Sequence, residues 1–97
     1  MHRTLKTPWY DETVKALQLA GMSERTQHCY ARSVRQLIEY HTKDPREITE
    51  AELKEYFLFR RNESEWAPGT MKICYSALKF FFIHVLRREW PVFEYLK

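Results

Sequence analysis

Residues 67–88 read APGTMKICYSALKFFFIHVLRR. Apolar side chains recur in this stretch three and four positions apart, which is the spacing of one face of an α-helix. Proline suits the first position of a helix, where its missing N–H has no partner to lose. We therefore expect a helix over residues 68–88, opened by Pro68 or Thr70 and stopped by Pro91. Its predicted apolar face consists of Met71, Cys74, Tyr75, Leu78, Phe81, Phe82 and Val85, extended by Ile73, Ala77 and Phe80.

A helix that is apolar around most of its circumference is usually the central one of its fold. A helix over residues 8–20 is predicted to pack against it, with Thr7 as its N-terminal cap and Gly21 just past its end. Val14 and Leu17 form part of the apolar face of this first helix.

A helix over residues 24–41 is predicted next, because Ser23 is a good N-cap. The sequence TKDPR at residues 42–46 breaks it. Residues at helical spacing form its buried stripe, namely Thr26, Tyr30, Val34, Leu37, Ile38 and His41.

A helix over residues 50–61 begins with a capping box, in which Thr49 and Glu52 each bond the backbone N–H of the other. Leu53, Tyr56 and Phe57 are expected to face inward. No alternation of period two lasts long enough to indicate a strand. The predicted fold class is therefore all-α, a compact four-helix orthogonal bundle that forms one domain over residues 1–97.

The composition sets limits on the environment and on cofactors. Cys29 and Cys74 are far apart and form no CxxC motif, so we expect a reducing, cytoplasmic compartment. Neither cysteine combines with a histidine at a spacing that suits zinc, so no metal and no cofactor is expected. The apolar run at residues 80–86 is too short to span a bilayer, and residues 1–10 lack the apolar region of a signal peptide.

Charge is unevenly distributed along the chain, although the net charge is only +3. Residues 66–88 contain basic side chains and no acidic one, whereas acidic side chains dominate residues 44–55. A positive and a negative side are expected, and the positive side is the candidate surface for nucleic acid.

Polar residues of the two longest predicted helices form stripes opposite the apolar faces. On the fourth helix, Lys72, Ser76, Lys79 and Arg87 fall within one sector together with Ile83. The first turn of that helix, around Thr70, offers free backbone N–H groups to a phosphate. On the second helix the stripe consists of Arg25, His28, Arg32 and Arg35, with Gln36.

Two interpretations of these stripes are open, because a polar helix face is often only solvated. In the first, cations hold phosphates while neutral polar groups reach base edges in the major groove of duplex DNA. The predicted DNA-binding residues are then Arg25, His28, Arg32, Thr70, Lys72, Ser76, Lys79 and Arg87.

Three stretches, in this order and spacing, carry a resemblance to a known family. They are SERTQHCY at residues 23–30, EITEAELKEY at residues 47–56, and APGTM at residues 67–71 followed by YSALKFFF at residues 75–82. The first, with Val34, Leu37 and Tyr40 behind it, resembles the second helix of the core-binding, SAM-like N-terminal domain of phage integrases and other tyrosine recombinases. The last resembles the final core helix of that domain. The similarity covers roughly residues 7–90.

This resemblance implies half of a C-shaped clamp around duplex DNA, with the second and fourth helices at the grooves. It also implies that a separate C-terminal domain, absent from this chain, cuts DNA through a tyrosine that forms a 3′-phosphotyrosyl link. The implied partners are double-stranded DNA, the catalytic domain of the same polypeptide and other recombinase protomers on DNA.

The fragment itself is not expected to be an enzyme, although its full-length parent is expected to be a tyrosine recombinase. His84 and Arg87 match the family's His-x-x-Arg motif by letters only, since they lie at the end of a core-binding helix. The tyrosines are interpreted as core or rim aromatics, because no partner for a nucleophile accompanies them.

The alternative from a different class is a small helical protein-interaction module. The feature that favours it is the apolar tail WPVFEY at residues 90–95, which is expected to be poorly covered.

Overall fold

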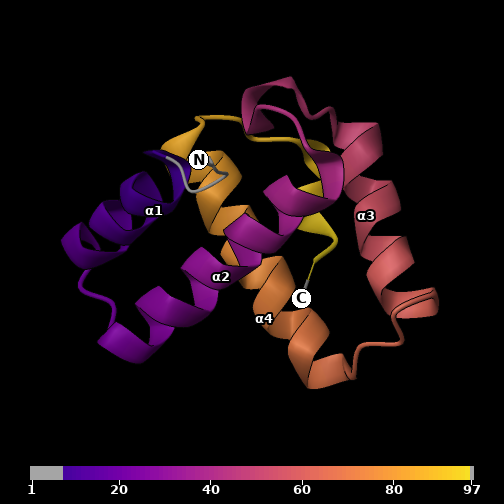
Figure 1. The fold of residues 1–97 in the computed structure, drawn as a ribbon, viewed down its shortest axis with the longest axis horizontal. Helices are drawn as coiled ribbons and strands as arrows, with labels where there is room; N and C mark the ends of the chain where they lie inside the picture. The colour runs from indigo at the N-terminus through magenta and orange to yellow at the C-terminus, as the bar shows by residue number, and fades with distance from the viewer. Residues whose placement is uncertain (1–7, 97) are drawn as a thin grey trace, which may run out of the picture.

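The computed structural model describes residues 8–96, and within them the fold is all-α (Figure 1). Four α-helices form the body of the molecule, and no strand occurs in this range. They are α1 (Pro8–Leu19), α2 (Glu24–His41), α3 (Glu50–Asn62) and α4 (Pro68–Phe80), with short helices η1 (Pro45–Glu47), η2 (Phe81–Val85) and η3 (Pro91–Glu94).

The helix ends follow local sequence signals. Ser23 caps α2 by accepting a hydrogen bond from the Thr26 N–H, and Thr49 and Glu52 form the predicted capping box of α3. After α1 the chain reverses at Gly21, whose φ of 78° is strained for any residue with a Cβ. The Met22 N–H then donates to the Leu17 carbonyl, which is the pairing that satisfies a helix C-terminus before a left-handed glycine. The predicted cap Thr7 lies outside the described residues.

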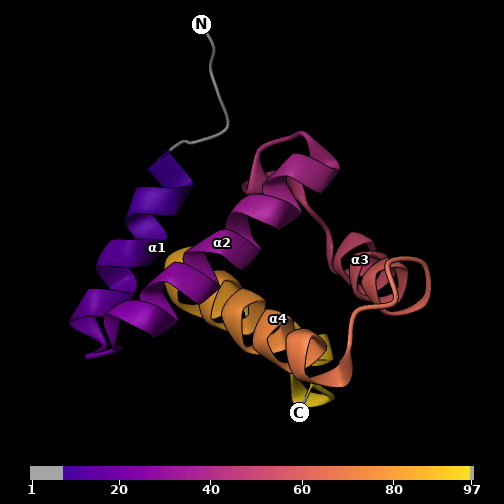
Figure 2. The ribbon, with the colours of Figure 1, turned by 60° about the horizontal axis from the view of Figure 1, so that its bottom comes forward.

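The core lies where α2, α3 and α4 face one another, with α1 packed on α2 (Figure 2). Leu37, Leu53, Tyr56 and Leu78 are fully buried, as the helical spacing predicts. Thr13 and Leu17 are the buried residues of α1, and Val14 is only half-buried. α4 and its continuation η2 contact the other three helices, so the predicted central position of the last helix is confirmed.

The fourth helix does not run to residue 88 as the sequence predicts. α4 ends at Phe80 and continues as a single π-helical stretch, Phe81–Val85, in which the Leu86 N–H donates to the Phe81 carbonyl. Phe81 and Phe82 are both fully buried, the first edge-on against Trp9 and the second against Trp90. The wider π turn lets these two adjacent rings pack on different partners, Trp9 and Trp90, and helical periodicity does not encode such tertiary contacts.

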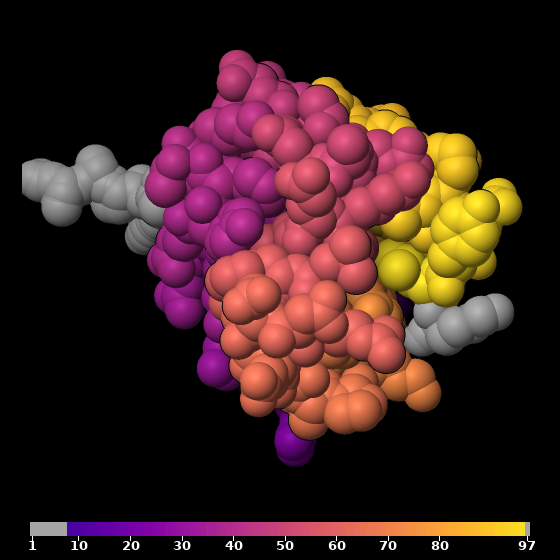
Figure 3. Space-filling view, turned by 90° about the vertical axis from the view of Figure 1, so that its right-hand side faces the viewer, coloured from indigo at the N-terminus to yellow at the C-terminus, as the bar shows by residue number. Residues whose placement is uncertain are grey.

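Pro91 does not stop the fourth helix but opens η3, and the tail that contains it folds back on the core. Val92 and Phe93 are buried, and the Val92 N–H donates to Glu50 Oε2 of α3 at 2.9 Å. Figure 3 shows this C-terminal segment, in yellow, beside the surface formed by α3. The expectation of a poorly covered tail is therefore wrong for Val92 and Phe93, whereas Pro91, Glu94 and Tyr95 are exposed.

Candidate nucleic-acid interface

α2 crosses α4 with their side chains in contact, for example Tyr30 and Phe80, whose ring centroids are 6.4 Å apart. All of the residues predicted to contact DNA on these helices are exposed. We define the α2–α4 face as Arg32, Gln36, Thr70, Ile73, Ser76 and Lys79, which line hollows along this crossing, together with Arg25 and Lys72, which share helical faces with Arg32 and Lys79.

One surface hollow lies between α2 and the first turns of α4. It has a volume of about 310 Å³ and brings Arg32 and Gln36 of α2 together with Thr70 and Ile73 of α4. Cys29, Ser33 and Trp66 complete its lining. Two of the predicted residues, Arg32 and Thr70, therefore share one site although they are far apart in the sequence.

A second hollow, of about 220 Å³, lies further along the same crossing. Ser76 and Lys79 line it together with Tyr30 of α2 and His84 of η2. Lys72 lies on the same side of α4 as Ser76 and Lys79, since residues three, four and seven apart share one helical face. The two hollows share no lining residue, but each is bordered by a cation, Arg32 of α2 at the first and Lys79 of α4 at the second.

Two predicted residues, His28 and Arg87, line neither of these hollows. His28 lines a different hollow, with Asp11 and Lys15 of α1, so it faces the α1 side of α2. Arg87 lies beyond the end of η2 with φ 61°, and its expected place on the same helical stripe as Lys72 is wrong. The cause is the π-helical stretch, which ends helical order before Arg87 and shifts the register after Phe80.

The cations of the α2–α4 face have no carboxylate partner within residues 8–96. The ion pairs formed in this range are Arg35–Glu39, Lys43–Glu52 and Arg46–Asp44. Arg25, Arg32, Lys72 and Lys79 belong to none of them. Their charge is available to an external anion, and such an arrangement favours a polyanionic partner.

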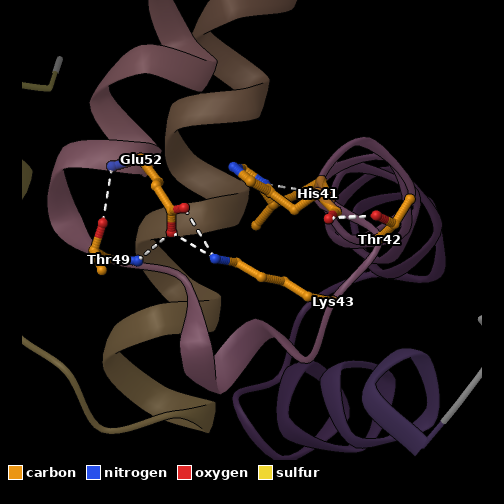
Figure 4. A network of polar contacts seen from close by, with 6 residues as sticks. His41, Thr42, Lys43, Thr49 and Glu52 are labelled. Carbon is orange, nitrogen blue, oxygen red and sulfur yellow. Dashed lines mark hydrogen bonds and ion pairs between the residues drawn. The ribbon is translucent and has the colours of Figure 1, made fainter.

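Three carboxylates of the acidic side predicted from the sequence, Asp44, Glu50 and Glu52, make internal contacts. We define the junction as residues 42–52, which link α2 to α3. Lys43 Nζ donates to both carboxylate oxygens of Glu52, at 3.0 and 2.9 Å, and Glu52 also accepts from the Thr49 N–H (Figure 4). The Thr49 N–H and then Lys43 lower the pKa of Glu52, while the bonds from the Arg46 side chain and backbone lower the pKa of Asp44.

Two features of the site were not predicted from the sequence. Trp66 lines the first hollow, and the Arg60 guanidinium lies 4.5 Å from the centre of its ring. Ile73, assigned to the apolar face, is 45% exposed on the crossing. The sequence held one signal for this exposure. Ile73 lies three residues after Thr70, so helical spacing puts it on the same side of the helix as that polar residue.

The buried reactive groups of the chain are poor candidates for chemistry. Burial raises the pKa of both the Cys74 thiol and the Tyr56 hydroxyl to about 12, which keeps each protonated and weakly nucleophilic. No group of three or more potential metal ligands occurs in residues 8–96. His84 packs on Phe80, with ring centroids 4.7 Å apart.

Within residues 8–96, no helix combines the length and apolar content that a membrane span requires.

Comparison with known proteins identifies the domain that this fold and face define. Residues 9–92 match the family described as phage integrase, N-terminal SAM-like domain. The match covers most of the chain, and the chain belongs to this family. The resemblance found in the sequence is therefore confirmed, as is the SAM-like all-α fold class.

Two relatives from Sinorhizobium fredii (strain NBRC 101917 / NGR234) are similar to the chain. "Putative integrase/recombinase y4qK" is 30% identical over 90 residues, which are 93% of this chain and 29% of that protein. "Putative integrase/recombinase y4eF" is 40% identical over 45 residues, which are 46% of this chain and 18% of that protein. The chain thus spans less than a third of the length of either relative. No solved structure matches the chain significantly.

Proposed function

We propose that the chain binds duplex DNA through the α2–α4 face, as the N-terminal clamp domain of a site-specific tyrosine recombinase. The observation that carries this proposal is the set of cations without carboxylate partners within residues 8–96, namely Arg25, Arg32, Lys72 and Lys79. Membership in the phage integrase family supports the kind of partner. The strand-transfer chemistry belongs to a catalytic domain of the same polypeptide, and other protomers on DNA are further partners.

The two kinds of side chain on this face have different tasks. The cations hold backbone phosphates and set the position of the domain on the duplex. The neutral groups of Gln36, Thr70 and Ser76, which lie between them, are placed to reach base edges. His28 and Arg87, which line neither of the two hollows, are assigned only peripheral phosphate contacts in this proposal. The cytoplasm, where DNA and free cysteines coexist, is the proposed location.

A salt titration of duplex binding tests this function. Fluorescence anisotropy of a labelled random-sequence duplex measures affinity at several salt concentrations. Lys72→Ala and Lys79→Ala are expected to weaken binding to all sequences, and each is expected to reduce the salt slope by about 1, because one phosphate contact is lost. Lys54→Ala is the matched control, since Lys54 is an exposed lysine of α3 between Glu50 and Glu55.

The control is expected to bind as the unchanged chain does. Equal affinities for the unchanged chain and both α4 variants would contradict the assignment of the face. Absence of salt-dependent binding to any duplex, together with concentration-dependent self-association, would instead favour the protein-interaction module.

A further inference from the structure

Ile73 is a large apolar side chain placed among polar groups on the α2–α4 face. It is 45% exposed, and it lines the first hollow beside Gln36, Arg32 and Thr70. Single exposed apolar residues are common on protein surfaces, so exposure alone does not indicate a role. Here the neighbours matter, because an apolar group, a side-chain amide and a cation border one hollow of about 310 Å³.

This set of groups matches the edge of one base pair. In the major groove an A·T pair presents the thymine C5-methyl group, which is apolar, beside the adenine N6 donor and N7 acceptor. A glutamine amide pairs with the two adenine atoms, and an apolar side chain covers the methyl group. A G·C pair offers no methyl group for an apolar side chain to cover.

The charges around the hollow are complementary to the rest of the duplex. Arg32 lines the hollow from α2, and Lys79 lines the neighbouring hollow further along the crossing. Neither forms an ion pair within residues 8–96. A cation at the apolar and amide-bearing hollow and another at the neighbouring hollow fit a base edge with phosphates nearby.

We propose that Ile73 and Gln36 read an A·T base pair in the major groove, with Ile73 on the thymine methyl group and Gln36 on the adenine edge. This specificity rests on the proposed DNA-binding function and adds to it the base pair that the first hollow recognises. Both residues act on sequence preference, whereas Arg32, Lys72 and Lys79 act on overall affinity.

The test begins with selection of bound sequences from a random duplex pool by the unchanged chain. The enriched duplex is then synthesised with deoxyuridine in place of each thymidine in turn, which removes only the methyl group. At one position this change is expected to weaken binding about fourfold, the effect of losing one buried methyl-sized group. Replacing the paired adenine with 7-deazaadenine, which lacks the N7 acceptor, is expected to weaken binding as well.

Two variants assign these effects to residues. Ile73→Ala is expected to bind the thymidine and deoxyuridine duplexes with equal affinity. Gln36→Ala is expected to bind the adenine and 7-deazaadenine duplexes with equal affinity. Leu58→Ala removes a comparably exposed apolar side chain from α3 and is expected to keep both preferences. The thermal unfolding midpoint of each variant verifies that it folds.

The possible outcomes distinguish failure of this inference from failure of the proposed DNA-binding function. If selection enriches no sequence, or if Ile73→Ala still distinguishes thymidine from deoxyuridine, the reading of an A·T pair is overturned while salt-dependent binding stands. If the unchanged chain binds neither the random pool nor any selected duplex, the proposed function itself fails.

Discussion

The junction and the α2–α4 face carry similar kinds of charged side chains in opposite arrangements. In the junction Lys43 contacts Glu52, and Arg46 contacts Asp44 through two guanidinium nitrogens. On the α2–α4 face, Lys72 and Lys79 are exposed and belong to no ion pair within residues 8–96.

This difference shows what a charge pattern along a sequence can and cannot indicate. The cations of the junction hold a turn and a helix start in place, and their charge is neutralised within the chain. The cations of the α2–α4 face form no ion pair within residues 8–96, so their electrostatic field extends to external partners. The spatial pairing of cations with carboxylates, rather than their number, distinguishes a surface for an anion from a structural contact.

The largest effect is expected from giving the face the carboxylate that it lacks. Ser76 is exposed four residues after Lys72 and three before Lys79, so Ser76→Glu places an acidic side chain within reach of both. This variant is expected to lower duplex affinity by about tenfold or more, through neutralised lysines and repulsion of phosphates. Ser76→Gln is the control, because glutamine has the size of glutamate but carries no charge. Equal duplex affinities of the two variants, measured by anisotropy, would contradict the claim that the unpaired cations of the α2–α4 face bind DNA.

Thr49 and Thr70 give a matched pair for the second prediction, since each stands at the start of a helix. Thr49 caps α3 through its hydroxyl, so Thr49→Ala is expected to cost about 1 kcal/mol of the free energy of unfolding. In a domain of this size that loss lowers the midpoint of thermal unfolding by about 4–8 °C. Thr70 is exposed and α4 has no side-chain cap, so Thr70→Ala is expected to leave stability unchanged. Similar thermal unfolding midpoints for both variants would contradict the stabilising role assigned to the Thr49 cap in the junction.

A smaller difference is expected between two arginines of α2. Arg35 lies 3.9 Å from Glu39, whereas Arg32 lines the first hollow and has no such partner within residues 8–96. Arg32→Ala is therefore expected to weaken duplex binding about threefold more than Arg35→Ala, an effect on the scale of one exposed ion pair. A larger loss for Arg35→Ala in the same anisotropy assay would contradict the assignment of a DNA contact to Arg32 at the first hollow.

The smallest effect concerns the pH dependence of stability. The pKa values of Glu52 and Asp44 lie below their ordinary values of 4.5 and 3.8 in the folded chain. A carboxyl group with a depressed pKa stabilises the fold above its unfolded-state pKa, and this contribution disappears as pH falls through the folded-state pKa. The unfolding midpoint is therefore expected to fall as pH is lowered below about 4.5.

Glu52→Gln isolates the contribution of one carboxyl group to this pH dependence. Glutamine keeps the capping geometry without titrating, so the variant is expected to show a shallower fall between pH 5 and pH 3, about the range in which carboxyl groups titrate. An identical pH profile for the variant would show that the Lys43–Glu52 contact does not contribute.

Much of the fold was predictable because its signals are local. Ser23, Gly21 and the Thr49 capping box set helix ends through bonds to residues at most five positions away. The buried faces of α2 and α3 follow from helical spacing, and Val34, Leu37 and Leu53 are buried as expected.

The errors arise where distant contacts decide. In the π-helical stretch Phe81 packs on Trp9, near the other end of the chain, and Phe82 packs on Trp90. In the tail Val92 and Phe93 pack in the core, and the Val92 N–H donates to Glu50, 42 positions earlier. Helical periodicity contains no information about such pairs, so it continued the helix to residue 88 and left the tail exposed.

The candidate site was predictable in its charges but not in its grouping. Helical spacing places Lys72, Ser76 and Lys79 on one side of α4. Only the packing of α2 on α4 brings Arg32 to Thr70, turns His28 toward α1 and leaves Ile73 exposed. These outcomes depend on how two helices cross, which the sequence of either helix alone does not specify.

The central claim is that the α2–α4 face, and not the junction side, contacts DNA. An NMR titration of the ¹⁵N-labelled chain with a short duplex tests it directly, because backbone amide shifts report contact residue by residue. The expected result is that shifts concentrate at residues 25–36 of α2 and residues 70–79 of α4, and diminish with added salt. Shifts concentrated in α3 and the junction, with α2 and α4 unaffected, would contradict the account.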